Sequence, residues 1–229
     1  MYRTLGRYSP RMRYAELTDD ALTSLDGSPL ARVAGFNPLA MGPAAAAAAL
    51  PDGGLVVGWS GGLGETLFER AFATWMPAGR SSLDAYLDAA EPVLRERGGR
   101  LLVRTHARHV ISDAQAAVGL LDAREGAVGV AFDPAGCLEA SMLADAEDHL
   151  VRFFELVGGR AEVIVLGSVL QPASLESEEP LVPAALGDGL LDPALLGRLV
   201  REHAREDAVV AVVGDDPEGQ LRRAGLVGG

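Results

Sequence analysis

The stretch that decides the fold runs from residue 100 to residue 134 and reads RLLVRTHARHVISDAQAAVGLLDAREGAVGVAFDP. Its two apolar runs, Leu101 to His106 and Ala127 to Asp133, do not alternate strictly between apolar and polar residues. That pattern is typical of parallel strands buried on both faces. Between them, Ser112 with Gln115 three residues later predicts a capping box that opens a helix through Leu121. The stretch therefore predicts one strand-helix-strand unit.

The same alternation continues on both sides of this unit. Further buried strands are predicted at Leu55 to Ser60, Ala161 to Ser168 and Ala208 to Val213. The helices between the strands have predicted N-caps at Ser81 or Ser82, Asp192 and Asp216, the last two followed by proline. Units of this kind form right-handed crossovers around a parallel sheet, which leaves an open doubly wound sheet or a (β/α)8 barrel.

The first 54 residues are short for the number of strands that a barrel requires. Tyr14 to Leu17 and Arg32 to Phe36 are two strand candidates, and Pro43 precedes a short alanine-rich helix. A barrel needs about three strands here, where roughly 30 residues per strand-helix unit is usual. A barrel would therefore be abbreviated at its start. Residues 171–185, rich in Pro, Ser and Glu, are predicted to form a loop over the strand ends.

Composition excludes several classes of function. The 229 residues contain 20 basic and 32 acidic side chains, a net charge of −12, so nucleic-acid binding is not expected. Every basic residue is arginine, which excludes lysine Schiff-base chemistry and a P-loop lysine. The single Cys137, expected to be buried and inert, excludes a disulfide framework and a cysteine zinc site. No membrane-length apolar run or secretory leader is evident, so we expect a cytoplasmic protein without a membrane partner.

Polar residues at the ends of two predicted neighbouring strands form the main candidate site. Arg104 and His106 are two residues apart at the end of one strand and share a face, and Asp133 ends the next strand. The carboxyl ends of parallel strands are where α/β proteins place their sites. Arg104 and Asp133 are natural ion-pair partners.

The stretch 100–134 resembles strand 5, helix 5 and strand 6 of the sugar phosphate isomerase/epimerase-like, xylose isomerase-type TIM barrels. Residues 81–99 resemble helix 4 of that family, LGDGLLDP at 186–193 resembles the segment before helix 7, and DDPEGQLRRA at 215–224 resembles the last turn and helix. The resemblance covers about residues 60 to 229. It implies a single domain over residues 1–229: an abbreviated (β/α)8 TIM-type barrel with parallel strands.

The resemblance also implies a divalent metal held by Glu, Asp, His and Glu on the last four strands. Of that set only Asp133 remains: Arg104 replaces the strand 5 glutamate, Val165 to Ser168 the strand 7 motif, and Ala211 or Val212 the final glutamate. One carboxylate does not hold a catalytic divalent ion against water. We therefore expect no metal and no cofactor, with the Arg104 guanidinium in the place of the cation.

The expected function is metal-independent, isomerase- or epimerase-like action on a small polar or anionic molecule of the sugar or polyol type. Asp133 and His106 would be the acid/base groups and Arg104 the electrostatic clamp. Whether the chain is an enzyme at all stays open, because a non-catalytic ligand- or partner-binding descendant fits the same residues. His109 and Ser168 are further candidate ligand-binding residues at strand ends.

Gly58-Trp59-Ser60-Gly61-Gly62 supports another alternative. It matches the G-x-S-x-G nucleophile elbow of α/β-hydrolases, with Ser60 as nucleophile. In a barrel the same segment follows strand 4, where Trp59, Ser60 and Glu65 are candidate ligand-binding residues and the glycine N–H groups could hold an anion.

The first fourteen residues contain four arginines, three tyrosines and no acid. This basic arm is expected to lie over an acidic surface of the protein itself or of a partner subunit, which makes a homo-oligomer possible.

Overall fold

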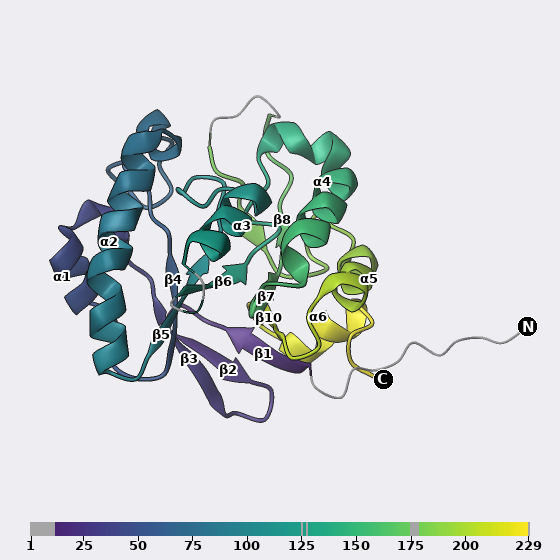
Figure 1. The fold of residues 1–229 in the computed structure, drawn as a ribbon. Helices are drawn as coiled ribbons and strands as arrows, with labels where there is room; N and C mark the ends of the chain where they lie inside the picture. The colour runs from purple at the N-terminus through teal and green to yellow at the C-terminus, as the bar shows by residue number, and fades with distance from the viewer. Residues whose placement is uncertain (1–11, 125, 127, 175–178, 229) are drawn as a thin grey trace, which may run out of the picture.

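The computed structural model describes residues 12–124, 126, 128–174 and 179–228 (Figure 1). Its centre is a closed barrel of eight strands in the spatial order β1-β10-β7-β6-β5-β4-β3-β2. The barrel strands are β1 (Arg13–Leu17), β2 (Ala21–Ser24), β3 (Pro29–Ala34), β4 (Leu55–Trp59), β5 (Arg100–Arg104), β6 (Val128–Phe132), β7 (Val163–Leu166) and β10 (Val209–Val213). The predicted abbreviated (β/α)8 barrel is therefore confirmed, and the open doubly wound sheet is wrong.

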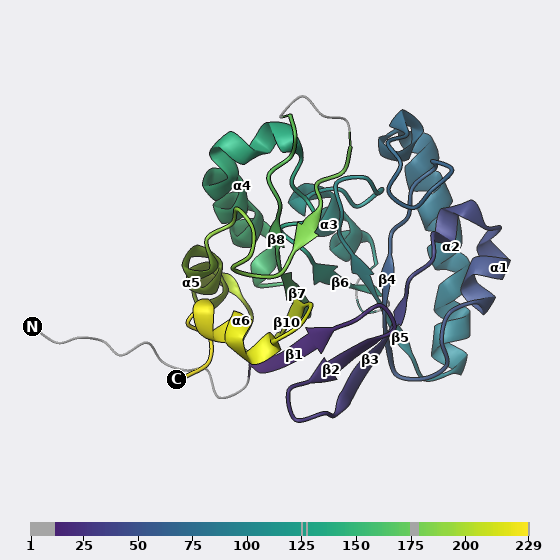
Figure 2. The same ribbon diagram turned by 180° about the vertical axis from the view of Figure 1, so that it is seen from behind.

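Helices surround the larger part of this barrel (Figures 1 and 2). They are α1 (Pro43–Ala48), α2 (Pro77–Glu96), α3 (Ala114–Ala123), α4 (Ala146–Phe153), α5 (Pro193–His203) and α6 (Pro217–Arg223). Short helical turns are η1 (Pro38–Ala40), η2 (Phe72–Trp75), η3 (Ala140–Asp145) and the π turn η4 (Phe154–Gly158). Two short strands, β8 (Ser168–Val169) and β9 (Pro183–Ala184), pair outside the barrel, so the predicted loop 171–185 contains part of a strand pair. No helix among these residues is long and apolar enough to cross a membrane.

The expectation that all barrel strands are parallel is wrong at β2. This strand pairs antiparallel with both β1 and β3, whereas every other neighbouring pair in the barrel is parallel. The connection from β1 is a turn in which Thr18 N–H donates to the Ala21 carbonyl at 2.9 Å, and the next turn uses Gly27 at φ +85°. A parallel crossover needs about a dozen residues, so these turns can only reverse the chain. The barrel is shorter at its start because two hairpins, β1–β2 and β2–β3, replace two strand-helix units.

Two of the predicted helix starts are confirmed and two are wrong. Asp192 and Asp216 cap α5 and α6 through their side chains. At α3 the cap is Asp113, whose Oδ1 accepts from Ala116 N–H at 2.8 Å, and Ser112 lies outside the helix. Helix α2 starts at Pro77, ahead of the predicted serine cap, because proline is preorganised for a first helical position.

Apolar side chains fill two layers, one inside the barrel and one between strands and helices. The interior layer includes Leu17, Leu22, Val57, Leu102 and Val163. At the amino-terminal end of the barrel the Arg100–Glu162 ion pair, 2.6 Å between Nη1 and Oε2, lies below this layer. A Cβ on Gly129 would lie 2.2 Å from Glu162, so glycine makes room for the pair. The layer separates that end from the carboxyl ends of the strands.

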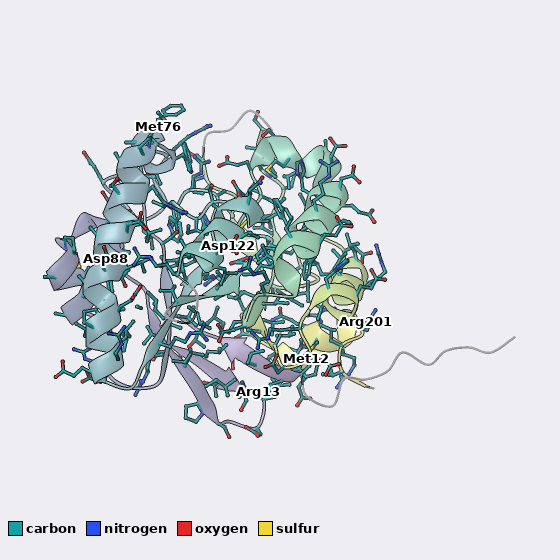
Figure 3. The ribbon with its side chains drawn as sticks, viewed as in Figure 1. Met12, Arg13, Met76, Asp88, Asp122 and Arg201 are labelled. Carbon is teal, nitrogen blue, oxygen red and sulfur yellow. The ribbon has the colours of Figure 1, made fainter. Side chains whose placement is uncertain are left out.

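The predicted basic arm lies mostly outside the described residues. The sequence predicts that this arm extends to Tyr14. Residues 1–11 are not described, and β1 begins at Arg13, so the last two residues of the predicted arm belong to a strand. Figure 3 shows Arg13 at the end of the molecule opposite Met76, the residue before α2.

Candidate functional site at the barrel mouth

A cavity of about 230 Å³ opens at the carboxyl ends of the strands, and we refer to it as the mouth cavity. Trp59 pairs in register with Arg104 and Arg104 with Ala131, so Asp133 follows two residues beyond that register and on the same face. The polar residues that line the cavity are Asp19, Arg104, His106, Arg108, Asp133, Glu139 and Ser168. The predicted triplet Arg104, His106 and Asp133 is therefore brought together at one cavity.

Arg104 and Asp133 form the ion pair that the sequence predicts. Both Nε, at 3.0 Å, and Nη2, at 2.6 Å, donate to the same carboxylate oxygen, Oδ2. The other oxygen, Oδ1, accepts from Gly136 N–H at 2.8 Å. The guanidinium also lies 4.4 Å from the centre of the Trp59 ring, which adds a cation–π contact. The side chains are 18% and 8% exposed, so the pair is held largely out of water.

The His106 ring is neutral, and its Nε2 atom carries the ring proton and can act as a hydrogen-bond donor. Burial lowers its pKa from 6.5 to about 3, and the charges of Arg104 and Arg108 act in the same direction. Its Nδ1 accepts from Arg108 N–H at 3.1 Å, so the single ring proton is on Nε2. The neutral ring therefore offers an N–H group to a ligand.

His109, predicted as a ligand-binding residue, does not line the mouth cavity. It is fully buried in a cluster of rings with Trp59, Phe68 and His106, and it stacks on Phe68 at a centroid distance of 5.3 Å. Burial lowers its pKa to about 3, and its Nε2 is 2.9 Å from the Leu67 carbonyl, to which it donates. Its ring therefore supports the wall of the site from behind.

Of the remaining ligand-binding candidates, two line the mouth cavity and two do not. Trp59 and Ser168 line the mouth cavity, and the Ser168 hydroxyl accepts from Leu191 N–H at 2.9 Å. Ser60 is fully buried away from the cavity, where its hydroxyl accepts from Ile111 N–H at 3.0 Å. Glu65 is exposed and lies outside the lining, in a segment where its own N–H donates to Glu69 at 2.6 Å.

The α/β-hydrolase alternative is wrong for this fold. The chain forms a closed barrel, and a nucleophile elbow needs a strained, accessible serine, which Ser60 is not. The proposed anion cradle is also already occupied by protein groups. Gly62 N–H donates to Asn37 Oδ1 at 3.2 Å, and Leu63 N–H donates to Thr74 Oγ1 at 2.9 Å.

Among the polar and aromatic residues that line the mouth cavity, sequence reasoning missed four. Asp19 follows β1, and Phe68 belongs to the loop after β4. Arg108 is 2% exposed and donates from Nη2 to Glu139 Oε2 at 3.2 Å, forming a second ion pair beside the first. Arg108 lies beyond the end of β5, in the turn after His106, so strand spacing does not predict its position, and nothing in the sequence marks Glu139.

The donor atoms at this mouth do not fit the divalent metal that the sequence resemblance implies. Both oxygens of Asp133 are engaged, one of them by a cation. The last two barrel strands contribute Val165 and Val213 to the cavity, and valine has no ligand atom. Among the described ranges, no group of three or more His, Cys, Asp or Glu side chains could hold a metal ion.

Cys137 is a buried free thiol, as the sequence predicts. Burial raises the pKa of this thiol, with a smaller opposing effect from a hydrogen bond with Thr105. The thiol therefore stays protonated and is not a nucleophile.

No protein-family model matches the chain, and no curated protein matches it. Several solved structures do match this chain. A xylose isomerase domain protein from Planctomyces limnophilus is 14% identical with a TM-score of 0.48, and the match covers 75% of this chain and 55% of that one. A xylose isomerase-like TIM barrel protein from Mycobacterium smegmatis, in complex with magnesium, is 11% identical with a TM-score of 0.47 and coverages of 76% and 60%. A 3-keto-D-glucoside 4-epimerase from E. coli is 17% identical with a TM-score of 0.47, and the match covers 75% of this chain and 62% of that one.

These matches are xylose isomerase-like barrels and a sugar epimerase. This chain spans between 55% and 62% of the length of the three matched structures. What it shares with them at these identities is the fold.

Proposed function

We propose that this chain binds a small sugar- or polyol-like molecule in the mouth cavity through its own side chains, without a divalent metal. The observation that carries the proposal is the Arg104–Asp133 pair, which lies on the cavity wall where a metal would need carboxylates. Beyond Nε and Nη2, Arg104 retains Nη1, for which no acceptor is found among the described residues. That N–H group is available to a hydroxyl oxygen.

The charges around the cavity favour a neutral ligand over an anionic one. Arg104 and Arg108 are each paired with a carboxylate, and Asp19 adds a third acid, so the lining has two positive and three negative side chains. The whole chain has a net charge of −12. A phosphate or carboxylate ligand would approach an unfavourable potential. Of the two classes that the sequence left open, the uncharged polyol fits better.

The remaining lining suits a molecule with one polar and one apolar face. Donors come from Arg104, from His106 Nε2 and from the Ser168 hydroxyl, and Asp19 supplies acceptors. Phe68 and Val213 supply apolar surface for the C–H groups of a ring. Pockets for drug-sized ligands are about 300 to 1,000 Å³, so a cavity of about 230 Å³ suits a single ring.

Binding is better supported than proton transfer, which favours the non-catalytic alternative. A general base needs a free lone pair within reach of the substrate. The free nitrogen of His106 already carries its proton, and each Asp133 oxygen accepts at least one hydrogen bond. Proton abstraction at His106 Nε2 would require the ring to change tautomer, and at Asp133 it would have to use an oxygen that already accepts a hydrogen bond.

Titration calorimetry with matched neutral and charged ligands tests the proposal. D-Glucose, D-xylose and myo-inositol represent neutral polyols, and gluconate and glucose 6-phosphate represent anions. We expect saturable binding of at least one neutral polyol, weakened about tenfold or more in Arg104→Gln, since a hydrogen bond to a charged group is worth about 1.5 to 3 kcal/mol. Arg205→Gln, which removes a half-buried arginine paired with Asp207 and outside the cavity lining, is the control and leaves affinity unchanged. Preferential binding of the anions, or affinity that does not depend on Arg104, would contradict the proposal.

Proton transfer is tested separately with the polyol that binds. Incubation in D2O followed by NMR detects any C–H bond that the protein opens. We expect no protein-dependent exchange. Exchange that is lost in His106→Ala and in Asp133→Asn, with folding intact, would restore the catalytic interpretation.

A further inference from the structure

A second hollow lies directly beside the mouth cavity. This outer cleft, of about 780 Å³, is lined by Arg70, Trp75, Ser141, Met142 and Phe153 among others. Its lining includes Trp75 of η2, which precedes α2, and residues of η3 and α4. Ala107 and Glu139 line both hollows. These two residues therefore form the partition between the outer cleft and the mouth cavity.

Arg108, which lies next to the partition between the hollows and lines the mouth cavity, has an unsatisfied donor. Ala107 N–H donates to the Gly136 carbonyl at 2.8 Å, and Glu139 accepts from Arg108 Nη2. The other terminal nitrogen of Arg108, Nη1, is buried and has no hydrogen-bond partner among the described residues. A buried guanidinium N–H without an acceptor is destabilising. An ether or hydroxyl oxygen at this partition would supply that acceptor.

The lining of the outer cleft is suited to an aromatic ring. Trp75 and Phe153 supply ring surface, and Met142 supplies a polarizable thioether that packs well against aromatic groups. Trp75 is fixed in place, because its Nε1 donates to the Ala107 carbonyl at 3.1 Å. Next to the lining, the Phe72 ring lies 6.0 Å from the Trp75 ring between centroids and is 74% exposed, and Met76, labelled in Figure 3, is 59% exposed.

We infer that the outer cleft is a second subsite, which receives an aromatic group joined through oxygen to the polyol in the mouth cavity. The ligand class is then an aryl glycoside or an aryl ether of a polyol. The inference rests on the proposed function, because the polyol part of the ligand occupies the mouth cavity. It adds what lies beyond that cavity: a ring against Trp75 and Met142, with the linking oxygen beside Arg108.

Calorimetry with the methyl and phenyl β-glycosides of D-glucose and D-xylose tests the inference. The methyl glycosides contain the linking oxygen without the ring. We expect the phenyl glycoside to bind at least about tenfold tighter than its methyl counterpart, a difference of about 1.4 kcal/mol. Ser141→Trp, which fills the cleft from an exposed position on η3, removes this advantage and leaves methyl glycoside affinity unchanged. Ala144→Trp, exposed on the same segment and outside the cleft lining, changes neither affinity.

Each other outcome identifies what fails. If methyl and phenyl glycosides bind equally, or if the advantage survives Ser141→Trp, the second subsite is wrong and polyol binding stands. Binding of free polyols without binding of either glycoside would likewise overturn the second subsite alone. If no polyol and no glycoside binds, the proposed function and this inference fail together.

Discussion

Arg104 and Asp133 show how one ion pair at the ends of two strands determines the chemistry of a barrel mouth. A carboxylate at the Arg104 position would leave Asp133 facing another anion, whereas the guanidinium neutralises it at 2.6 Å and stacks on Trp59. The pair is mostly buried, so each partner depends on the other. Strand periodicity is enough to predict this contact, because inward-facing residues on neighbouring parallel strands meet at the same end.

The interdependence of this pair is measurable by a double-mutant cycle. Arg104→Gln and Asp133→Asn each remove one charge and leave the other poorly compensated, so each should lower the free energy of unfolding by about 2 kcal/mol. The double variant should lose at least about 1 kcal/mol less than the sum, because the partner charge is removed as well. Urea unfolding at a pH of about 8 measures both effects. Strictly additive losses would show that the two side chains do not interact in solution.

His106 and His109 make stability fall as pH falls. Both have a folded pKa of about 3, below the ordinary 6.5, so the unfolded chain binds more protons between these values. Stability is therefore fully present above pH 6.5 and is lost as pH decreases toward 3. Between about pH 8 and about pH 5 the loss is about 2 kcal/mol per histidine. Replacing His109 by Gln should reduce the slope of unfolding free energy against pH in this range. An unchanged slope would show that His109 is not buried as a neutral ring.

The positions of these two histidines were not equally predictable. His106 faces the mouth because it is two residues beyond Arg104, and this follows from strand geometry. The chain turns after His106, where His109 N–H donates to the His106 carbonyl at 2.9 Å, so strand periodicity no longer applies. Ser60 was misplaced for a related reason: it follows the inward Trp59 by one residue and therefore faces away from the barrel interior.

At the scale of elements, caps and breakers predict where helices begin only when two signals coincide. Asp-Pro pairs marked α5 and α6 correctly, since an Asx side chain and a preset φ act together. Serine caps at α2 and α3 were wrong because a neighbouring residue, Pro77 or Asp113, offered a better start. The antiparallel β2 was missed because four residues, ALTS, are too short to show a period.

Close packing between elements can be tested with two glycines inside helices. A Cβ on Gly197 of α5 would lie 1.8 Å from the Ala224 carbonyl oxygen that follows α6, whereas a Cβ on Gly119 of α3 would meet only Arg80 Nη2 at 3.5 Å. Gly197→Ala should cost about 2 kcal/mol, because backbone must move. Gly119→Ala should stabilise by about 0.5 to 1 kcal/mol through helix propensity. Chemical denaturation compares the two variants. A stabilising Gly197→Ala would mean that α5 and α6 are farther apart than described.

At the scale of the whole molecule, the two ends of the barrel have different roles. The amino-terminal end is closed by the Arg100–Glu162 pair beneath the apolar interior, and the carboxyl end holds both hollows. The strands β4, β5, β6, β7 and β10 and the polar residues at the ends of β5 and β6 were predictable, since buried parallel strands and their polar ends can be recognised in the sequence. The outer cleft was not predictable, because η2 and η3 form its walls and such turns leave no periodic pattern.

The barrel mouth as a whole determines how the molecule responds to divalent metal ions. Its inward strand ends present Trp59, an arginine-bound Asp133, Val165 and Val213, so no three ligand groups converge among the described residues. At a free metal concentration about 100 times the dissociation constant, binding at a single site would raise the free energy of unfolding by about 2.7 kcal/mol. Such an increase is easily measured as a higher melting temperature. We expect Mg²⁺, Mn²⁺ and Zn²⁺, each titrated to about 1 mM, to produce no saturable increase of that kind. A saturable increase that disappears in Asp133→Asn would place a metal at the mouth after all. It would also require Arg104 to leave the carboxylate, because a divalent ion and a guanidinium cannot both occupy Oδ2 at contact distance.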